Sequence, residues 1–87
     1  MNEKEKGMII FSLNYVKNNI NKKSENVQCR NWIKTAIETV EKSGIPSVNF
    51  IVSNLEAIDG YFSGRASKLS SNDVFEKIKM IITLIES

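Results

Sequence analysis

Apolar residues recur in four segments of the chain, at the three- and four-residue steps that bring side chains to one face of an α-helix. The first segment shows the pattern most simply, with apolar residues at Ile9, Leu13, Val16 and Ile20. Polar or glycine-containing stretches separate the segments. The predicted helices lie near residues 5–21, 27–43, 46–62 and 71–86. Because short links make consecutive helices antiparallel neighbours, we expect an all-α fold, an antiparallel up-and-down four-helix bundle.

The ends of the expected helices carry residues that favour termination or capping. Gly44 can adopt the left-handed conformation after the second helix, and Pro46 suits the first position of the third because that position needs no N–H donor. Ser70 and Asp73 form a shortened capping box, and Leu69 stands where an apolar residue packs back onto the fourth helix. The link after Gly44 is therefore predicted to be two or three residues long.

Two clusters rich in β-branched residues leave strands as an alternative, Met8–Phe11 and Met80–Thr83. Each cluster lies within a longer 3.6-residue pattern, and the second follows the capping residues at Ser70. We therefore favour helices at both places.

The composition is that of one globular domain. The chain has 87 residues, of which 41% are hydrophobic and 25% are charged, enough apolar material for one core and too little chain for two. We expect a single helical domain over residues 1–87. Twelve basic and ten acidic residues leave a net charge of +2, which neither demands nor excludes an anionic partner.

The residue inventory lacks the groups on which most small enzymes depend. There is no histidine and one cysteine, Cys29, which excludes a histidine-based triad, a Cys/His zinc site and an internal disulfide. Glu38 and Glu41, like Asp73 and Glu76, are surface neighbours on a helix and need not converge as an acid–base pair. No strand is expected before Gly60 and Gly64, so a P-loop is absent. We expect a non-catalytic protein with no cofactor, metal ion or small-molecule substrate.

The apolar runs are short. The longest fall far below the roughly 18 residues that cross a bilayer, and the N-terminus mixes acidic and basic residues before its apolar cluster. A lone cysteine is at home where thiols stay reduced. We expect a cytoplasmic protein that reaches a membrane surface only through a partner.

A cationic cluster keeps nucleic-acid binding open as an alternative. Its members are Lys17, Lys22, Lys23, Arg30 and Lys34. A helix-turn-helix across the second and third helices is disfavoured, because the stretch from Ser47 to Gly64 has no Lys or Arg and has two carboxylates that would face phosphates. The alternative function is a small nucleic-acid-binding transcriptional regulator.

The segment from Asp59 to Lys68 is the expected partner-binding surface. It combines aromatic, arginine and glycine residues on an expected connection, and tyrosine and arginine are common at interface hot spots. The predicted contact residues are Glu56, Asp59, Tyr61, Arg65 and Lys68. If the partner is basic, the two carboxylates would steer its association. Tyr61 or Phe62 could instead cover the end of the bundle.

The order of these features resembles the enterocin A immunity family, small basic four-helix proteins that protect the producers of class IIa bacteriocins. The resemblance covers residues 29–86. It is carried by Lys42-Ser43, Ile45-Pro46-Ser47, the helix with Val48, Ile51 and Leu55, and Leu69-Ser70. In size and helix number the chain also resembles the helical immunity proteins that are paired with contact-delivered bacterial toxins.

Both resemblances imply one class of function. They imply an immunity protein that protects the producing bacterium by binding and neutralising a cognate antibacterial toxin or bacteriocin. The partner would be a bacteriocin–receptor complex in the first group and the toxin itself in the second.

Overall fold

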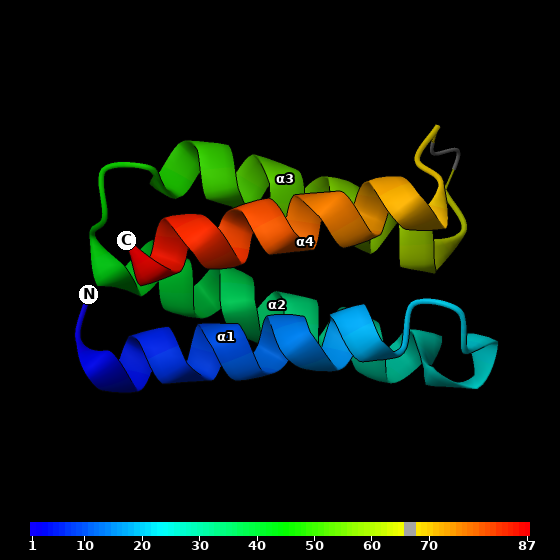
Figure 1. Cartoon of the computed structure of the whole chain (residues 1–87), viewed down its shortest axis with the longest axis horizontal. Helices are drawn as coiled ribbons and strands as arrows, with labels where there is room; N and C mark the ends of the chain where they lie inside the picture. The colour runs from blue at the N-terminus through cyan, green and yellow to red at the C-terminus, as the bar shows by residue number, and fades with distance from the viewer. Residues whose placement is uncertain (66–67) are drawn as a thin grey trace.

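Four α-helices lie side by side in the computed structural model, which describes residues 1–65 and 68–87 (Figure 1). In that described part the elements are α1 Glu3–Asn18, the 3₁₀ helix η1 Lys23–Glu25, α2 Asn26–Ser43, α3 Val48–Ser63 and α4 Ser71–Glu86. The expected all-α class is confirmed. The strand alternative is wrong, because both β-branched clusters lie inside helices, one in α1 and one in α4.

Each helix packs against two others. α1 and α3 both contact α2 and α4, and α3 and α4 are the least closely packed of the four neighbouring pairs. Figure 1 shows the chain reversing direction at each connection between helices, with the N- and C-termini at the same end. The four helices therefore surround one elongated core in a body of 33 × 20 × 18 Å.

The apolar stripes of the four helices meet in this core, as expected. The buried apolar residues are Ile9, Leu13, Val16, Ile20, Cys29, Ile33, Ala36, Val40, Ile51, Leu55, Ile58, Phe62, Val74, Ile78, Ile81 and Ile85. Burial raises the pKa of the Cys29 thiol to about 11, with the nearby Glu25 charge as a smaller cause. The thiol therefore stays protonated at neutral pH and packs as a small apolar group.

Two helices begin with reciprocal capping boxes. At α4 the Asp73 N–H donates to Ser70 Oγ at 3.1 Å and the Ser70 N–H donates to Asp73 Oδ2 at 2.9 Å, which confirms the predicted box. The Ser70 N–H that donates to the carboxylate, with a smaller contribution from the Ser70 side chain, stabilises the charged form and lowers the pKa of Asp73. At α1 an equivalent box joins Asn2 and Glu5, and it starts the helix at Glu3, two residues before the predicted position.

The predicted end of the first helix is wrong by three residues. The α-helix stops at Asn18, and the Asn19 side-chain amide donates to the Tyr15 carbonyl at 2.8 Å. Because this side chain supplies the donor that a continuing helix would take from its backbone, the chain can turn away here.

Glycine ends α2, as predicted, but the link to α3 differs from the prediction. Gly44 adopts φ = +70°, the left-handed conformation that favours glycine. Pro46 does not open the third helix, because the Val48 N–H bonds to the Ile45 carbonyl in a turn and α3 begins only at Val48. The link therefore extends from Gly44 to Ser47, longer than expected.

Candidate functional site

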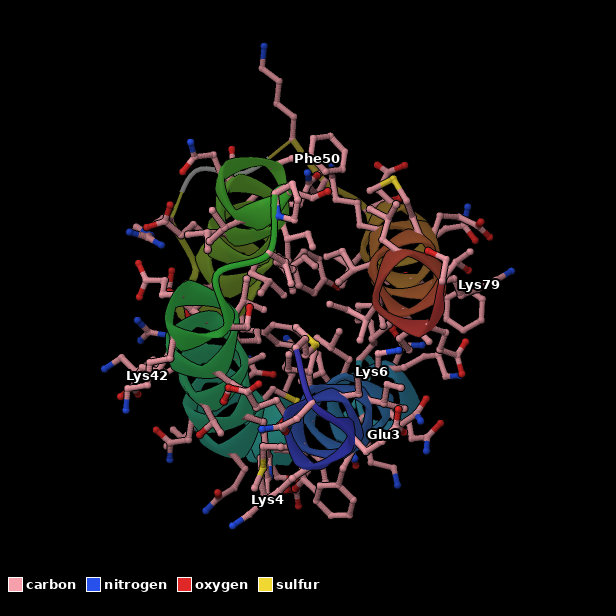
Figure 2. The ribbon with its side chains drawn as sticks, turned by 90° about the vertical axis from the view of Figure 1, so that its left-hand side faces the viewer. Glu3, Lys4, Lys6, Lys42, Phe50 and Lys79 are labelled. Atoms are coloured by element: carbon pink, nitrogen blue, oxygen red, sulfur yellow. The ribbon has the colours of Figure 1, made fainter. Side chains whose placement is uncertain are left out.

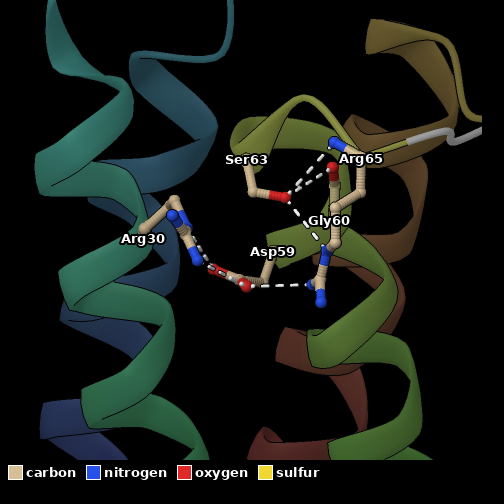
Figure 3. Close-up of polar contacts among 5 residues, drawn as sticks. All are labelled: Arg30, Asp59, Gly60, Ser63 and Arg65. Carbon is tan, nitrogen blue, oxygen red and sulfur yellow. Dashed lines mark hydrogen bonds and ion pairs between the residues drawn. The ribbon is translucent and has the colours of Figure 1, made fainter.

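Asp59 of α3 lies between two arginines. Its Oδ1 accepts from Arg30 Nε of α2 at 3.0 Å, and its Oδ2 accepts from Arg65 Nη2 at 3.2 Å and from Arg30 Nη2 at 3.4 Å (Figure 3). The Asp59 side chain is 15% exposed. The structure thus joins one residue of the predicted nucleic-acid set, Arg30, to two of the predicted partner-binding set.

The pairing changes what these residues offer to a partner. Both carboxylate oxygens of Asp59 are occupied by guanidinium donors, so its charge is offset within the molecule. The same contacts raise the pKa of Arg30, first through the hydrogen bond to Asp59 and then through its charge. The Arg30–Asp59–Arg65 cluster therefore ties α2, α3 and the segment after α3 together.

The end of α3 is shaped to receive Arg65. Gly64 adopts φ = +76° and turns the chain back, so that Arg65 Nε donates to Ser63 Oγ at 3.1 Å (Figure 3). The guanidinium lies over Gly60, where an added Cβ would be 3.7 Å from Arg65 Nη2. Such a contact is of ordinary van der Waals length, so the arrangement leaves room for alanine at Gly60.

Among the described residues, the other predicted partner-binding residues take no part in the hydrogen bonds of this cluster. Glu56 and Lys68 are exposed. Tyr61 lies within α3, not on a connection, and its ring meets Phe62 edge to face at 5.2 Å. Phe62 is buried and Tyr61 half-buried, so both rings help to cover this end of the core. Residues 66–67, in the middle of the predicted segment, lie outside the described residues.

The predicted cationic cluster divides into separate places. Lys17 and Lys22 line a surface pocket of about 360 Å³ beside Ser71 and Asn72 at the start of α4. Lys23 lines a different pocket with Asn26 and Tyr61. Lys34 is exposed on α2, and Arg30 is paired as described. Only two of the five predicted residues thus share one pocket.

An aromatic cluster between α1 and α2 was missed from the sequence. The Trp32 ring meets Phe11 edge to face with centroids 5.1 Å apart, and it meets Tyr15 at 6.0 Å. The Tyr15 hydroxyl donates to Glu25 Oε2 at 2.6 Å. This hydrogen bond, with desolvation and the Glu25 charge, raises the pKa of Tyr15 to about 12. The cluster is thus fixed by ring contacts and by one strong hydrogen bond.

This cluster forms one side of the bundle, which we call the α1/α2 face: Met8, Phe11, Tyr15 and Trp32. Phe11 is 58% exposed and Met8 is 42% exposed, while Tyr15 and Trp32 are half-buried. The stripe predicted for this helix is Ile9, Leu13, Val16 and Ile20, and the three α1 residues of the face stand outside it. Their exposure could have been inferred from their position, because they lie to one side of that stripe, as Trp32 does on α2.

A second set of exposed apolar side chains lies on the seam between α3 and α4. We call it the α3/α4 face: Phe50, Met80 and Leu84. Figure 2 shows Phe50 pointing outward on the side of the bundle opposite Lys4. One side-chain hydrogen bond crosses this seam, from Lys77 Nζ to Asn54 Oδ1 at 2.9 Å.

Residues 1–65 and 68–87 contain neither a cluster of metal ligands nor a membrane-spanning helix. No group of three His, Cys, Asp or Glu side chains in this part of the chain could hold a metal ion. No helix there is both long enough and apolar enough to cross a membrane. No protein-family model, curated protein or solved structure significantly matches this chain.

Proposed function

We propose that this protein is an immunity protein that protects the producing bacterium by binding and neutralising a cognate antibacterial toxin or bacteriocin, without catalysis. The observation that carries the proposal is the α1/α2 face, where a phenyl ring and a thioether stay accessible beside a tyrosine and a tryptophan. Contiguous exposed apolar surface is typical of interaction sites, and aromatic residues are enriched where binding energy concentrates.

The geometry of this face supports stoichiometric binding. Trp32 is held between two rings and Tyr15 is held by Glu25, so both side chains lose little rotamer freedom on association. All four side chains project from helices that the core anchors, and regular helices hold a contact surface more firmly than loops do. The face is therefore formed before a partner arrives.

The partner class comes from the resemblance to the enterocin A immunity family and to the helical immunity proteins of contact-delivered toxins. In this proposal the protein acts in the cytoplasm, and its partner is the toxin or a bacteriocin–receptor complex. The capped helices and the four-helix packing are features that the resemblance leads one to expect.

A protection assay tests this function. The chain is expressed in a sensitive bacterial host, which is then challenged with enterocin A or made to co-express the product of the reading frame next to its own gene. We expect a raised inhibitory concentration or rescued growth against one of the two. The control carries Leu13→Asp, which places a charge in the core and prevents folding. Equal sensitivity of wild-type and control cells to both toxins would contradict the proposal.

A nucleic-acid-binding regulator is the second candidate, favoured by the pocket where Lys17 and Lys22 lie beside the first turn of α4. It predicts an electrophoretic shift of duplex DNA from the upstream promoter that survives about 150 mM salt. Lys17→Gln with Lys22→Gln should abolish that shift, and Lys42→Gln, which lines a different groove with Lys4 and Met8, should leave it unchanged. A shift that disappears at this salt would remove the candidate.

A further inference from the structure

We infer that the α1/α2 face is the toxin-binding surface and that it accepts a protein whose own surface offers an apolar pocket bordered by carboxylates. The inference rests on the proposed function. It places recognition on a different side of the bundle from the segment after α3, where Asp59 is already engaged by Arg30 and Arg65.

The apolar centre of the face has the form of an anchor. Phe11 stands on the outer side of α1 with more than half of its surface exposed, yet its ring rests against Trp32 and has a defined position. Met8 lies one turn away on the same helix, and its flexible thioether can adapt to the shape of a pocket. A rigid ring beside an adaptable side chain fits a concave apolar partner surface.

The charges at one end of the face select an acidic partner. Lys4 and Lys42 line a groove of about 410 Å³ with Met8 and Thr39. Neither lysine takes part in an ion pair among the described residues. Figure 2 shows both extending into solvent from the ends of α1 and α2. The carboxylate in the same groove, Glu5, caps α1 by accepting from the Asn2 N–H, so the groove presents two ammonium groups for carboxylates to approach.

The charges at the other end argue against a second copy of this chain as the occupant. There Lys22 and Lys23 adjoin one carboxylate, Glu25, whose Oε2 accepts from Tyr15. Two copies docked through this face would oppose lysines to lysines in either direction along the helices. A partner with carboxylates at its border avoids that repulsion.

The α3/α4 face offers a weaker case for the same partner. No ring–ring contact joins Phe50 to another aromatic side chain among the described residues, and the seam beneath it is the least closely packed. Phe50 is nonetheless 51% exposed, close to the value for Phe11. It therefore provides a control substitution of the same chemistry on the opposite side of the molecule.

Trp32 provides a direct readout because it is the single tryptophan of the chain. The full-length protein is produced with 5-fluorotryptophan and titrated with the unlabelled toxin that it neutralises in the protection assay. We expect the fluorine resonance to shift in a saturable 1:1 titration. The inference is overturned if the toxin binds and the resonance does not move.

Paired variants then locate the energy of binding. Phe11→Ala should weaken toxin binding by at least about tenfold, whereas Phe50→Ala should change it by less than about twofold. Circular dichroism and thermal unfolding of both variants establish that each is folded. The opposite ranking of the two variants, with Phe50→Ala the weaker binder, contradicts the inference.

Charge reversal tests the acidic border. Lys4→Glu with Lys42→Glu should slow association with the toxin by about tenfold at low salt, and the difference from wild type should shrink as salt is added. Lys34→Glu, an exposed lysine on another side of α2, should leave the rate nearly unchanged. Equal effects of both changes on the association rate would contradict the inference that carboxylates border the partner's pocket.

Other occupants would also be visible at Trp32. A resonance that shifts with protein concentration alone identifies a second copy as the occupant, and one that shifts on adding an oligo(rU) strand at about 150 mM salt identifies nucleic acid. Either result overturns the inference. Absence of protection by the wild-type chain marks failure of the proposed function, whereas protection by the wild type together with unchanged toxin binding by Phe11→Ala marks failure of the inference alone.

Discussion

The α1–α2 pair and the α3–α4 pair are built from similar amphipathic helices, yet their outer surfaces differ. Between α1 and α2, three aromatic rings meet and a tyrosine hydroxyl is bound by a carboxylate. Between α3 and α4, the packing is less close and one lysine–asparagine hydrogen bond crosses the seam. Among the described residues, the exposed apolar side chains on one side are therefore ordered by ring contacts, and those on the other side are not. Five predictions test this contrast.

Matched core truncations should show the largest effect. Leu13 on α1 and Leu55 on α3 are both fully buried, so Leu13→Ala and Leu55→Ala remove the same atoms. We expect Leu13→Ala to lower the free energy of unfolding by about 4 kcal/mol and Leu55→Ala by about 3 kcal/mol, because a looser seam can collapse into the cavity. Urea denaturation measures both. An equal or larger loss for Leu55→Ala would contradict the looser packing of the α3–α4 seam.

The next largest effect concerns the ion pairs of Asp59, which hold α3 against α2 where α4 packs less closely on α3. Asp59→Asn leaves Arg30 and Arg65 facing each other without a full counter-charge. We expect a loss of about 1–2 kcal/mol in unfolding free energy, at the lower end for an ion-pair deletion because both guanidiniums reach solvent. The control is Glu56→Gln, three residues earlier and exposed, which should change stability by less than about 0.5 kcal/mol.

A smaller effect is expected from the Tyr15 hydroxyl, which closes the α1/α2 cluster. Tyr15→Phe should lower the unfolding free energy by about 1 kcal/mol at neutral pH, because Glu25 loses its donor.

The same hydroxyl predicts a pH dependence. The folded-state pKa of Tyr15 is raised from 10.0 to about 12, so its contribution is complete below pH 10 and is lost as the pH rises through 12. The stability difference between wild type and Tyr15→Phe should therefore shrink over that interval. An ultraviolet titration of the Tyr61→Phe variant, in which Tyr15 is the single tyrosine, measures the ionisation directly. Ionisation of Tyr15 near pH 10 would contradict the hydrogen bond.

The smallest effect should come from the hydrogen bond across the other seam. Asn54→Ala removes the acceptor of Lys77, which can bind water instead, and should lower the unfolding free energy by about 0.5 kcal/mol. Hydrogen exchange of the α3 and α4 amides provides a second measurement. An effect as large as that of Tyr15→Phe would show that the α3–α4 seam depends on this bond more than its packing suggests.

Local signals explain which parts of the fold were predictable from the sequence. α4 has the bounds that were predicted, because its capping residues Ser70 and Asp73 have the capping-box spacing and stand just before its apolar pattern. α1 begins and ends where side chains of Asn2 and Asn19 bond to the backbone, and asparagine is common enough in loops that neither stood out. Periodicity thus located the helices, and individual hydrogen bonds set their ends.

The candidate site was less predictable because it depends on which sides of the helices meet. Arg30 and Asp59 are separated by 29 residues, and their pairing follows from the rotation of α2 against α3. The contact of Phe11 with Trp32 likewise follows from the rotation of α1 against α2. Residue type marked arginine, aspartate and tyrosine as candidates, but it could not show that Asp59 is already neutralised.

On α1, fully buried and exposed apolar residues alternate along the first turns of the helix. Ile9 and Leu13 have no exposed surface, while Met8 and Phe11, their near neighbours in the sequence, are 42% and 58% exposed. Substitutions at the outer positions therefore leave the interior packing intact. Binding specificity can therefore evolve by single substitutions at these positions while each intermediate sequence keeps its core.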